Sequence, residues 1–424
     1  MPFRLAKLKP RQSVGVEYHP SLRFENVPRG SLPSPESRSE ALIEARNFKM
    51  AKSIHAYVRG STLKFYEWLE ASGPRLPQGP AVWICGDCHL GNLGPTSDRR
   101  GGVEMQIRDL DQTVIGNPAH DLVRLGLSLA SAVRASDLPG VTITLMIEAL
   151  VAGYEAALEG NFGPDAEKRD RPGAVKGVLK RAMRRGWRHL IEERMKDISP
   201  SIPLGPHFWP VTKTERHKLE QLCSTPEVRK MVTQLRGRQP DDRIELVDAA
   251  YWVKGCSSLG RLRFAVLLRL NRSDLCLVDI KEAIAAAAPR AAQAKMPRDN
   301  ALRMVAGAAA LSPSLGHRMM AARFMGKAVV LRELTPQDLK LEIDQLTRAE
   351  AVSLAGYLAG VVGYAHGRQM SLESRRGWLE TLSDGRSAEL NAPSWLWSSV
   401  VDLMPIHEVA YLEHCRAFAS RETA

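Results

Sequence analysis

A polar loop between two short apolar runs is the sequence feature that most constrains this fold. Residues 86–92 read GDCHLGN and follow the apolar run AVWIC. Such a run, bounded by glycine and polar residues, predicts a buried strand that ends in a loop. A second short strand is predicted at 105–107, and it leads directly to Asp109. Two such strand ends can place Asp87, Asn92 and Asp109 around one point.

This set of side chains suits the transfer of a phosphoryl group. That reaction needs a carboxylate to orient or deprotonate the attacking hydroxyl, and hard oxygen ligands for Mg²⁺ on the nucleotide phosphates. Asp-x-x-x-x-Asn followed by a strand-borne Asp resembles the catalytic loop and metal-binding Asp of protein-kinase-like enzymes. It is closest to the aminoglycoside and choline phosphotransferase branch. The later G-D-P-x-x-D-L pattern of that branch corresponds to 116–122, with Asn117 where Asp is usual.

More of the chain resembles the DUF2252 family, a bacterial family of no assigned function that is thought to be kinase-like. The resemblance extends from about Arg46 to the C-terminal helix. Its segments are YVRG at 57–60, GCSSLG at 255–260, IKEA at 280–283 and YAHGR at 364–368. It implies an ATP- and Mg²⁺-dependent transferase that acts on a hydroxyl, with a small-molecule acceptor expected before a protein.

The resemblance also implies roles for the residues of the polar loop and the segment after it. Asp87 would be the catalytic base, and Asn92 and Asp109 would be Mg²⁺ ligands. Asp111 would be a further carboxylate that replaces or assists Asp109. His89 would be structural and would hold the loop by hydrogen bonds.

Three other polar residues each have two open interpretations. Arg59 and His366 are shared with the family and could contact phosphate or substrate, but pairing in the core or at the surface is an equal alternative. Asp121 lies at the start of a predicted helix, where it could cap the helix or bind the backbone of the loop.

A glycine-containing hairpin and a lysine form a second candidate site. Gly255 and Gly260 enclose Ser257 and Ser258 between two strand-like runs, and Lys281 ends the next strand. A glycine hairpin can lie close over phosphates, and a strand lysine can pair with their oxygens. This resembles the glycine-rich loop and nucleotide-binding lysine of a kinase small lobe, except that Ser257 stands where a middle glycine is expected. An ordinary glycine turn is the alternative.

The order of these segments differs from that of ordinary kinase-like chains. The hairpin and lysine here follow the catalytic loop instead of preceding it. The expected fold is therefore α+β, a protein-kinase-like two-lobed fold with a late-inserted small lobe or a circular permutation. The glutamate partner of the lysine is open: Glu282 would point to the other face of the sheet, and Glu333 or Glu342 could serve.

The chain divides into four expected regions. Residues 1–40 form a loose arm, 41–235 a mainly helical lobe with the catalytic loop, 240–345 a β-rich nucleotide-clasping lobe, and 346–424 helices that complete the helical lobe. No run of eighteen apolar residues occurs, so no transmembrane span is expected. The N-terminus does not read as a secretory signal, and six cysteines do not make a disulfide framework. A cytoplasmic location is expected.

The net charge of +12 favours anionic partners, which include nucleotides, nucleic acid and acidic membrane surfaces. Part of the excess lies on a basic helix predicted over 174–195. This helix could contact RNA, membrane or phosphate. A solvated basic face is favoured, because no aromatic interleaving or known nucleic-acid motif accompanies the charges.

Cys85 and Cys88 form a C-x-x-C pair, which leaves thiol redox chemistry or zinc open as a minor alternative. Three functions remain: the phosphotransferase, a pseudokinase or AMP transferase of the same fold, and a basic nucleic-acid or membrane-surface binding protein. The intact Asp87, Asn92 and Asp109 argue against a dead site. The near-isosteric Asp87→Asn change is expected to keep the fold unless Asp87 is a buried structural partner. The acceptor and the oligomeric state cannot be read from the sequence.

Overall fold

The structure is a computed structural model, and part of the chain is described in it. The described residues are 32–72, 75–163, 171–184, 201–234, 238–255, 259–271, 274–334, 346–384, 386 and 390–422. Several predicted features fall outside these residues. They are most of the N-terminal arm, Ser257, Ser258, Glu342 and the second half of the basic helix.

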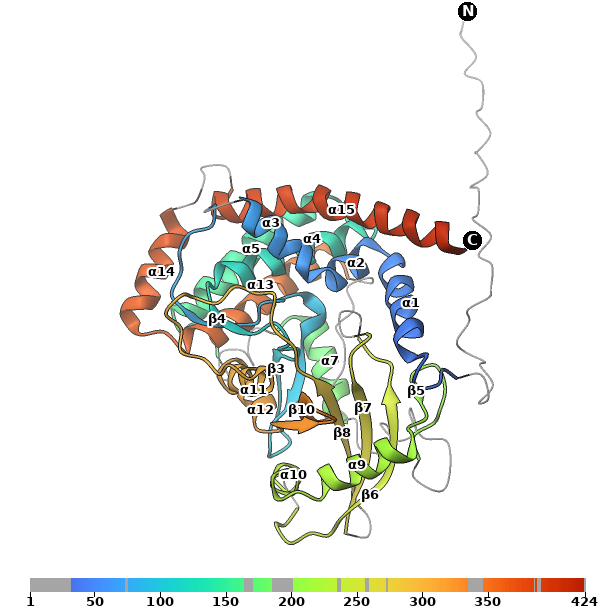
Figure 1. The fold of residues 1–424 in the computed structure, drawn as a ribbon. Helices are drawn as coiled ribbons and strands as arrows, with labels where there is room; N and C mark the ends of the chain where they lie inside the picture. The colour runs from blue at the N-terminus through green and yellow to red at the C-terminus, as the bar shows by residue number, and fades with distance from the viewer. Residues whose placement is uncertain are drawn as a thin grey trace, which may run out of the picture.

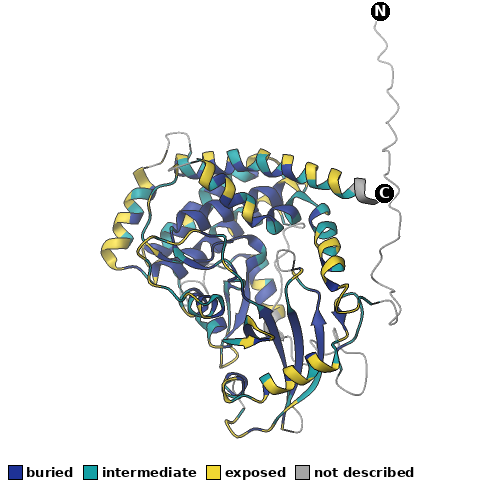
Figure 2. Cartoon of the chain, in the orientation of Figure 1, coloured by how far each residue is buried: buried dark blue, intermediate teal, exposed yellow. Residues whose placement is uncertain are grey.

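Most helices gather in one part of the molecule and the large sheet lies in another, so the fold is α+β (Figure 1). The helical part consists of α1 (Arg38–Ala51), α2 (Ile54–Gly60), α3 (Thr62–Ser72), α4 (Ala119–Arg134), α5 (Val141–Leu158), α7 (Gly173–Arg184), α13 (Arg348–Gly367), α14 (Leu372–Asp384) and α15 (Ser394–Glu422). Helix α4 is buried along nearly its whole length, whereas α14 and α15 carry exposed outer faces (Figure 2). The first segments of the chain and the last helices therefore enclose one core.

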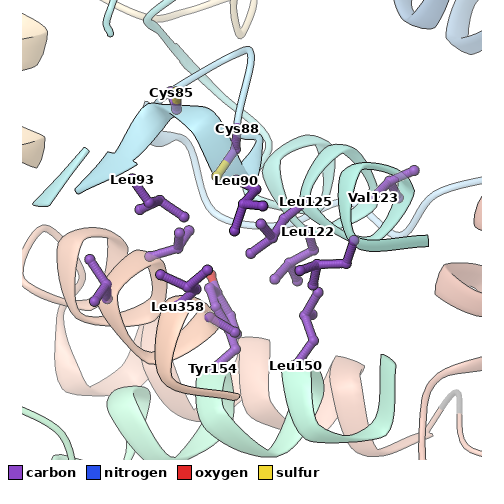
Figure 3. Close-up of a cluster of buried hydrophobic side chains, with 14 of the residues drawn as sticks. Cys85, Cys88, Leu90, Leu93, Leu122, Val123, Leu125, Leu150, Tyr154 and Leu358 are labelled. Carbon is purple, nitrogen blue, oxygen red and sulfur yellow. The ribbon is translucent and has the colours of Figure 1, made fainter. Parts of the chain in front are cut away.

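Helix α5 is, among the described helices, the one long and apolar enough to cross a membrane by length and composition. In the fold it packs against α13, and Tyr154 of α5 lies beside Leu358 of α13 in the core, in the same cluster as Leu150 (Figure 3). The helices approach closely because Gly153 has no side chain: a Cβ there would collide with the carbonyl of Gly356. Helix α5 is thus a core helix of the helical part.

A six-stranded antiparallel sheet forms the other part, in the order β5-β6-β7-β8-β10-β9. Its strands are β5 (Phe208–Trp209), β6 (Ile244–Trp252), β7 (Arg263–Leu270), β8 (Asp274–Glu282), β9 (Met319–Phe324) and β10 (Lys327–Leu334). Helices α9 (Lys213–Cys223) and α10 (Pro226–Val232) cover one face, where Leu219 and Val228 pack with Val266 and Val278. Since side chains alternate along a strand, Arg263, Asp279 and Lys281 lie on the opposite face.

Two small hairpin-like sheets connect these parts. Strand β1 (Val82–Ile84) pairs with β4 (Val114–Gly116), and β2 (Leu93–Ser97) pairs with β3 (Val103–Ile107). The polar loop lies between β1 and β2 and includes the 3₁₀ turn Leu90–Asn92. Helices α11 (Asn300–Leu311) and α12 (Pro313–Gly316) pack between the large sheet and the small ones.

The described half of the basic helix is α7, and it has two distinct sides. Val175, Val178 and Leu179 are buried in the core, whereas Lys176 and Lys180 are exposed. This alternation is that of an amphipathic surface helix.

Two buried histidines predict a loss of stability in acid. Burial lowers the pKa of His120 on α4 and of His407 on α15 to about 4. Between about pH 6.5 and pH 4 the unfolded chain binds protons at these positions and the native protein does not, so stability falls as the pH decreases through this window. Urea unfolding across this range should show the decrease, and the His120→Asn/His407→Gln double variant should show a shallower one. An unchanged slope in the double variant would contradict this assignment.

Candidate functional site

Asp121 binds the backbone at the start of the polar loop. Its carboxylate accepts hydrogen bonds from the backbone N–H groups of Cys85, at 2.7 Å, and Gly86, at 2.9 Å. Gly86 has a φ of +73°, and a side chain there would collide with the backbone of Gln112. Of the two interpretations of Asp121, binding of the loop backbone is the one that the structure shows.

His366 belongs to this support of the loop. Its Nε2 lies 3.2 Å from Oδ2 of Asp121, and its Nδ1 lies 3.0 Å from the hydroxyl of Tyr154. His366 has no exposed surface. Of its two interpretations, pairing in the core is the one that the structure shows.

Asp87 forms a buried ion pair. Its Oδ1 accepts a hydrogen bond from Nε of Arg124, and its Oδ2 accepts one from the hydroxyl of Thr62, both at 2.8 Å. Arg124 is completely buried, and its Nη2 also donates to the carbonyl of Val58 at 2.6 Å. Burial raises the pKa of Asp87, while the charge of Arg124 opposes that rise. Asp87 is thus a buried structural partner, which was the condition under which Asp87→Asn would disturb the fold.

His89 lies in the same loop and is buried. Its Nε2 is 3.9 Å from Oδ2 of Asp87, which is too far for a hydrogen bond. Burial, followed by the charges of Arg59 and Arg124, lowers the pKa of His89 well below its usual value. The ring is therefore neutral, and it packs inside the loop.

Asn92 ends the loop with its side chain turned back onto the backbone. Its Nδ2 donates to the carbonyl of Asp87 at 2.9 Å, and its own carbonyl accepts from the N–H of Arg108 at 2.7 Å. The second bond ties the loop to the residue before Asp109. The amide nitrogen of Asn92 donates inside the loop, and the carboxamide oxygen is the atom that can bind a metal ion.

Lys281 reaches Asp109 and Asp111 from the large sheet. Its Nζ lies 3.4 Å from Oδ1 of Asp109 and contacts Oδ2 of Asp111. Neither described glutamate considered as a partner takes this role, because Glu282 pairs with Lys327 and Glu333 pairs with Arg238. Two aspartates from the segment between β3 and β4 take the place expected for a glutamate.

The two aspartates differ in the direction of their pKa shifts and in exposure. Burial opposes ionisation of Asp109, but the charges of Lys281, Arg263 and Arg332 outweigh it and lower the pKa of Asp109 below its usual range. Burial and the neighbouring Asp109 raise the pKa of Asp111. The Asp109 side chain is 45 % exposed, against 10 % for Asp111. Asp109 is therefore the more accessible member of the pair and the one whose ionised form is stabilised.

A cavity of about 210 Å³ joins these groups. Its lining residues are Arg59, Gly91, Asn92, Arg108, Asp109, Leu110, Asp111, Lys254, Gly255, Arg263, Asp279, Lys281, Met304, Met319, Val330 and Arg332. Most lining residues are charged, and Leu110, Met304, Met319 and Val330 supply apolar surface. Asp87 belongs to the loop, but its side chain is buried and is not among the residues that line the cavity.

The glycine hairpin reaches the cavity at one end. It joins the neighbouring antiparallel strands β6 and β7, and Gly255 lines the cavity. Gly255 and Gly260 have φ angles of +93° and +94°, which favour glycine. The hairpin thus carries glycine where its backbone turns beside the charged groups.

The available oxygen ligands suit Mg²⁺ better than zinc. Magnesium keeps several waters and is bound by one or two carboxylates together with phosphates. Asn92 and the ionised Asp109 fit such a partial set. Among the residues that the structure describes, no group of three or more His, Cys, Asp or Glu side chains could hold a metal ion.

Cys85 and Cys88 are core residues (Figure 3). Their mutual hydrogen bond and burial raise the pKa of Cys85. The same hydrogen bond lowers the pKa of Cys88, but burial and the charges of Asp121 and Asp87 outweigh it, so the pKa of Cys88 is raised. The thiolate is the reactive form of cysteine. The environment therefore disfavours the redox alternative.

Among the charged residues of the site that sequence reasoning missed are Arg124, Arg263, Asp279 and Arg332. Arg263 donates two hydrogen bonds to Asp279, at 2.9 and 2.5 Å, and Arg332 lies 3.8 Å from the same carboxylate. Arg124 holds Asp87 from α4. Each lies inside a run of mostly apolar residues, and a charge in such a run is the signal that could have identified it.

Comparison with known proteins gives one match. Neither a search of curated proteins nor a search of solved structures finds a significant relative. The family model described as an uncharacterized protein conserved in bacteria (DUF2252) matches residues 38–417. This range covers the helical part, the large sheet and the polar loop, so the chain belongs to the DUF2252 family.

Proposed function

We propose that this protein is an ATP- and Mg²⁺-dependent phosphotransferase of the kinase-like type, which acts on a hydroxyl of a small acceptor in the cytoplasm. The observation that carries the proposal is the meeting of Lys281 with Asp109, 3.4 Å apart although 172 residues separate them in the chain. A lysine for phosphates beside an Asp and an Asn for the metal is the set that phosphoryl transfer uses.

In this proposal the cavity holds the nucleotide by its charged and apolar sides. Lys281 pairs with phosphate oxygens, and the backbone at Gly255 lies over them. Met304, Met319 and Val330 line the apolar side, which suits a nucleobase. Asn92 and Asp109 hold Mg²⁺, which neutralises charge that develops on the transferred group.

The proposed fold is a two-lobed kinase-like arrangement with reordered segments. The large sheet, within 208–334, would be the nucleotide-clasping lobe inserted between the helices of the other lobe. The support is topological: the hairpin with Gly255 and the strand with Lys281 are adjacent in this sheet. The polar loop lies outside the sheet, between β1 and β2.

Asp87 has the raised pKa that suits a general base. Each of its oxygens accepts one hydrogen bond and keeps a further lone pair for an incoming hydroxyl. Asp87 is buried and does not line the cavity, however, and this favours a second candidate. In that candidate the protein binds nucleotide without phosphoryl transfer, or it transfers AMP. The two candidates differ in product and not in the nucleotide site.

Product analysis with ATP labelled separately at its α- and γ-phosphates tests the proposal. We expect ADP and a γ-labelled product from incubation with a metabolite extract and Mg²⁺; pyrophosphate and an α-labelled product would favour AMP transfer. Lys281→Met should reduce turnover at least about tenfold, because a charged contact to phosphate is lost. Lys327→Met is the matched control, since Lys327 is half exposed and pairs with Glu282 away from the cavity.

Cysteine variants complete this test. Cys85→Ser and Cys88→Ser should keep Mg²⁺-dependent turnover, because the proposed reaction uses no thiolate. Absence of Mg²⁺-dependent ATP binding in the wild-type protein would overturn the proposal. Inactive serine variants beside an unaffected Lys281→Met would point to the thiols instead.

A further inference from the structure

The cavity contains more positive charge than the proposed nucleotide site uses. Six basic residues and three carboxylates line it. They are Arg59, Arg108, Lys254, Arg263, Lys281 and Arg332, against Asp109, Asp111 and Asp279. A metal-bound triphosphate neutralises only part of this excess, because the divalent ion cancels two of the phosphate charges. The remaining charge suits a second anionic ligand.

Five of the six basic residues fall into two groups by their origin, and the sixth, Lys254, follows strand β6. Arg263, Lys281 and Arg332 project from the large sheet and face its carboxylate, Asp279, or the Asp109 pair. Arg59 and Arg108 come from the other side of the cavity. Arg59 is in the last turn of α2, and Arg108 directly follows β3.

Both of these arginines lie against glycines that flank Asn92. A Cβ at Gly91 would be 2.7 Å from Nη2 of Arg59, and a Cβ at Gly94 would be 2.8 Å from Nη1 of Arg108. Glycine at each position therefore leaves room for a guanidinium against the backbone of the polar loop and of β2. The two cations are placed beside the loop itself.

Electrostatics agree with this placement. After burial, the charge of Arg59 is the largest cause of the lowered pKa of His89, inside the loop. Its field therefore reaches the segment that carries Asp87 and Asn92. A guanidinium binds phosphate or carboxylate through two parallel hydrogen bonds, so a pair of them can orient an anionic group.

We propose that the acceptor is an anionic hydroxyl compound, whose phosphate or carboxylate group is held by Arg59 and Arg108; this inference rests on the proposed function. In the transfer step the acceptor oxygen forms a bond to the γ-phosphorus, and the bond from that phosphorus to the β–γ bridging oxygen breaks. ADP leaves with the electron pair. The hydroxyl proton is released to solvent water.

Calorimetric titration of inorganic phosphate into the protein, saturated with Mg²⁺ and a non-hydrolysable imido analogue of ATP, tests the anion site. Phosphate should bind this complex, and Arg59→Gln and Arg108→Gln should each weaken its binding at least about tenfold. Analogue affinity should stay within about threefold of wild type. A parallel titration with acetate separates a phosphate-bearing acceptor from a carboxylate-bearing one.

Two further variants make the result interpretable. Arg59→Lys keeps the charge but not the paired hydrogen bonds, so phosphate affinity should fall between those of wild type and Arg59→Gln. Arg323→Gln is the control, because Arg323 on β9 is 72 % exposed and does not line the cavity. Thermal unfolding of each variant shows whether the fold is kept.

Several outcomes would overturn the acceptor assignment. The first is that the wild-type complex binds neither phosphate nor acetate. The second is that phosphate displaces the ATP analogue. The third is that the arginine variants lower the affinity for the analogue as much as the affinity for phosphate. Failure of the proposed function has a separate signature, which is no Mg²⁺-dependent binding of the analogue. In that case phosphate is titrated into the free protein, and equal affinity in wild type and both glutamine variants would exclude the anion site.

Discussion

Replacement of Asp87 by Asn is expected to lower the free energy of unfolding by about 3–5 kcal/mol, the cost of breaking a buried ion pair from one side. The change leaves the charge of the fully buried Arg124 without its carboxylate partner. It also replaces the carboxylate oxygen that accepts the hydrogen bond of the Thr62 hydroxyl with an amide nitrogen, which cannot accept that bond. Urea denaturation near neutral pH measures the effect.

A double-mutant cycle isolates this ion pair. Asp87→Asn combined with Arg124→Met should be less destabilised than the sum of the single variants, because the stranded charge is removed. Asp402→Asn is the matched control, since its partner Arg75 is 61 % exposed and the pair should contribute only about 0–1 kcal/mol. If Asp87→Asn had the same free energy of unfolding as the wild type, the ion pair would not stabilise the loop.

Asp109→Asn is expected to reduce the Mg²⁺-dependent affinity for ATP by roughly 10²- to 10³-fold. A carboxylate on a divalent ion contributes several kcal/mol, and each 1.4 kcal/mol is about tenfold in affinity. Asp109 is the ionised and accessible carboxylate of the cavity. Calorimetric titration of ATP with and without Mg²⁺ gives the comparison.

The contrast with Asp87→Asn makes this result specific. A base acts mainly during transfer, so Asp87→Asn should keep most of the Mg²⁺ dependence under conditions where the variant is folded. Asp402→Asn again serves as the neutral control. Equal Mg²⁺ dependence in Asp109→Asn and wild type would remove Asp109 from the metal site.

Local patterns predicted the strands beside the polar loop. The apolar run before the loop contains β1, and the strand predicted at 105–107 lies within β3. Both are short, mainly apolar runs that lead into polar residues. Strand β9 (Met319–Phe324) was not predicted. Strand β9 is half-buried at the edge of the sheet, which explains its weak pattern.

Only the part of the candidate site whose residues are close together in the sequence could be predicted. The loop from Asp87 to Asn92 could be found because its residues are close in the sequence. The partner of Asp87 is Arg124, and those of Lys281 are Asp109 and Asp111. Tertiary packing of separate helices and sheets brings these residues together. No spacing rule in a single sequence selects such contacts.

The central claim is that one cavity binds MgATP between the polar loop and the large sheet. A crystal structure with Mg²⁺ and the imido analogue of ATP tests it most directly. The account predicts a metal ion bound by the oxygens of Asn92 and Asp109, with Lys281 on the phosphates. A nucleotide bound elsewhere on the protein, or a metal ion that contacts neither residue, would contradict it.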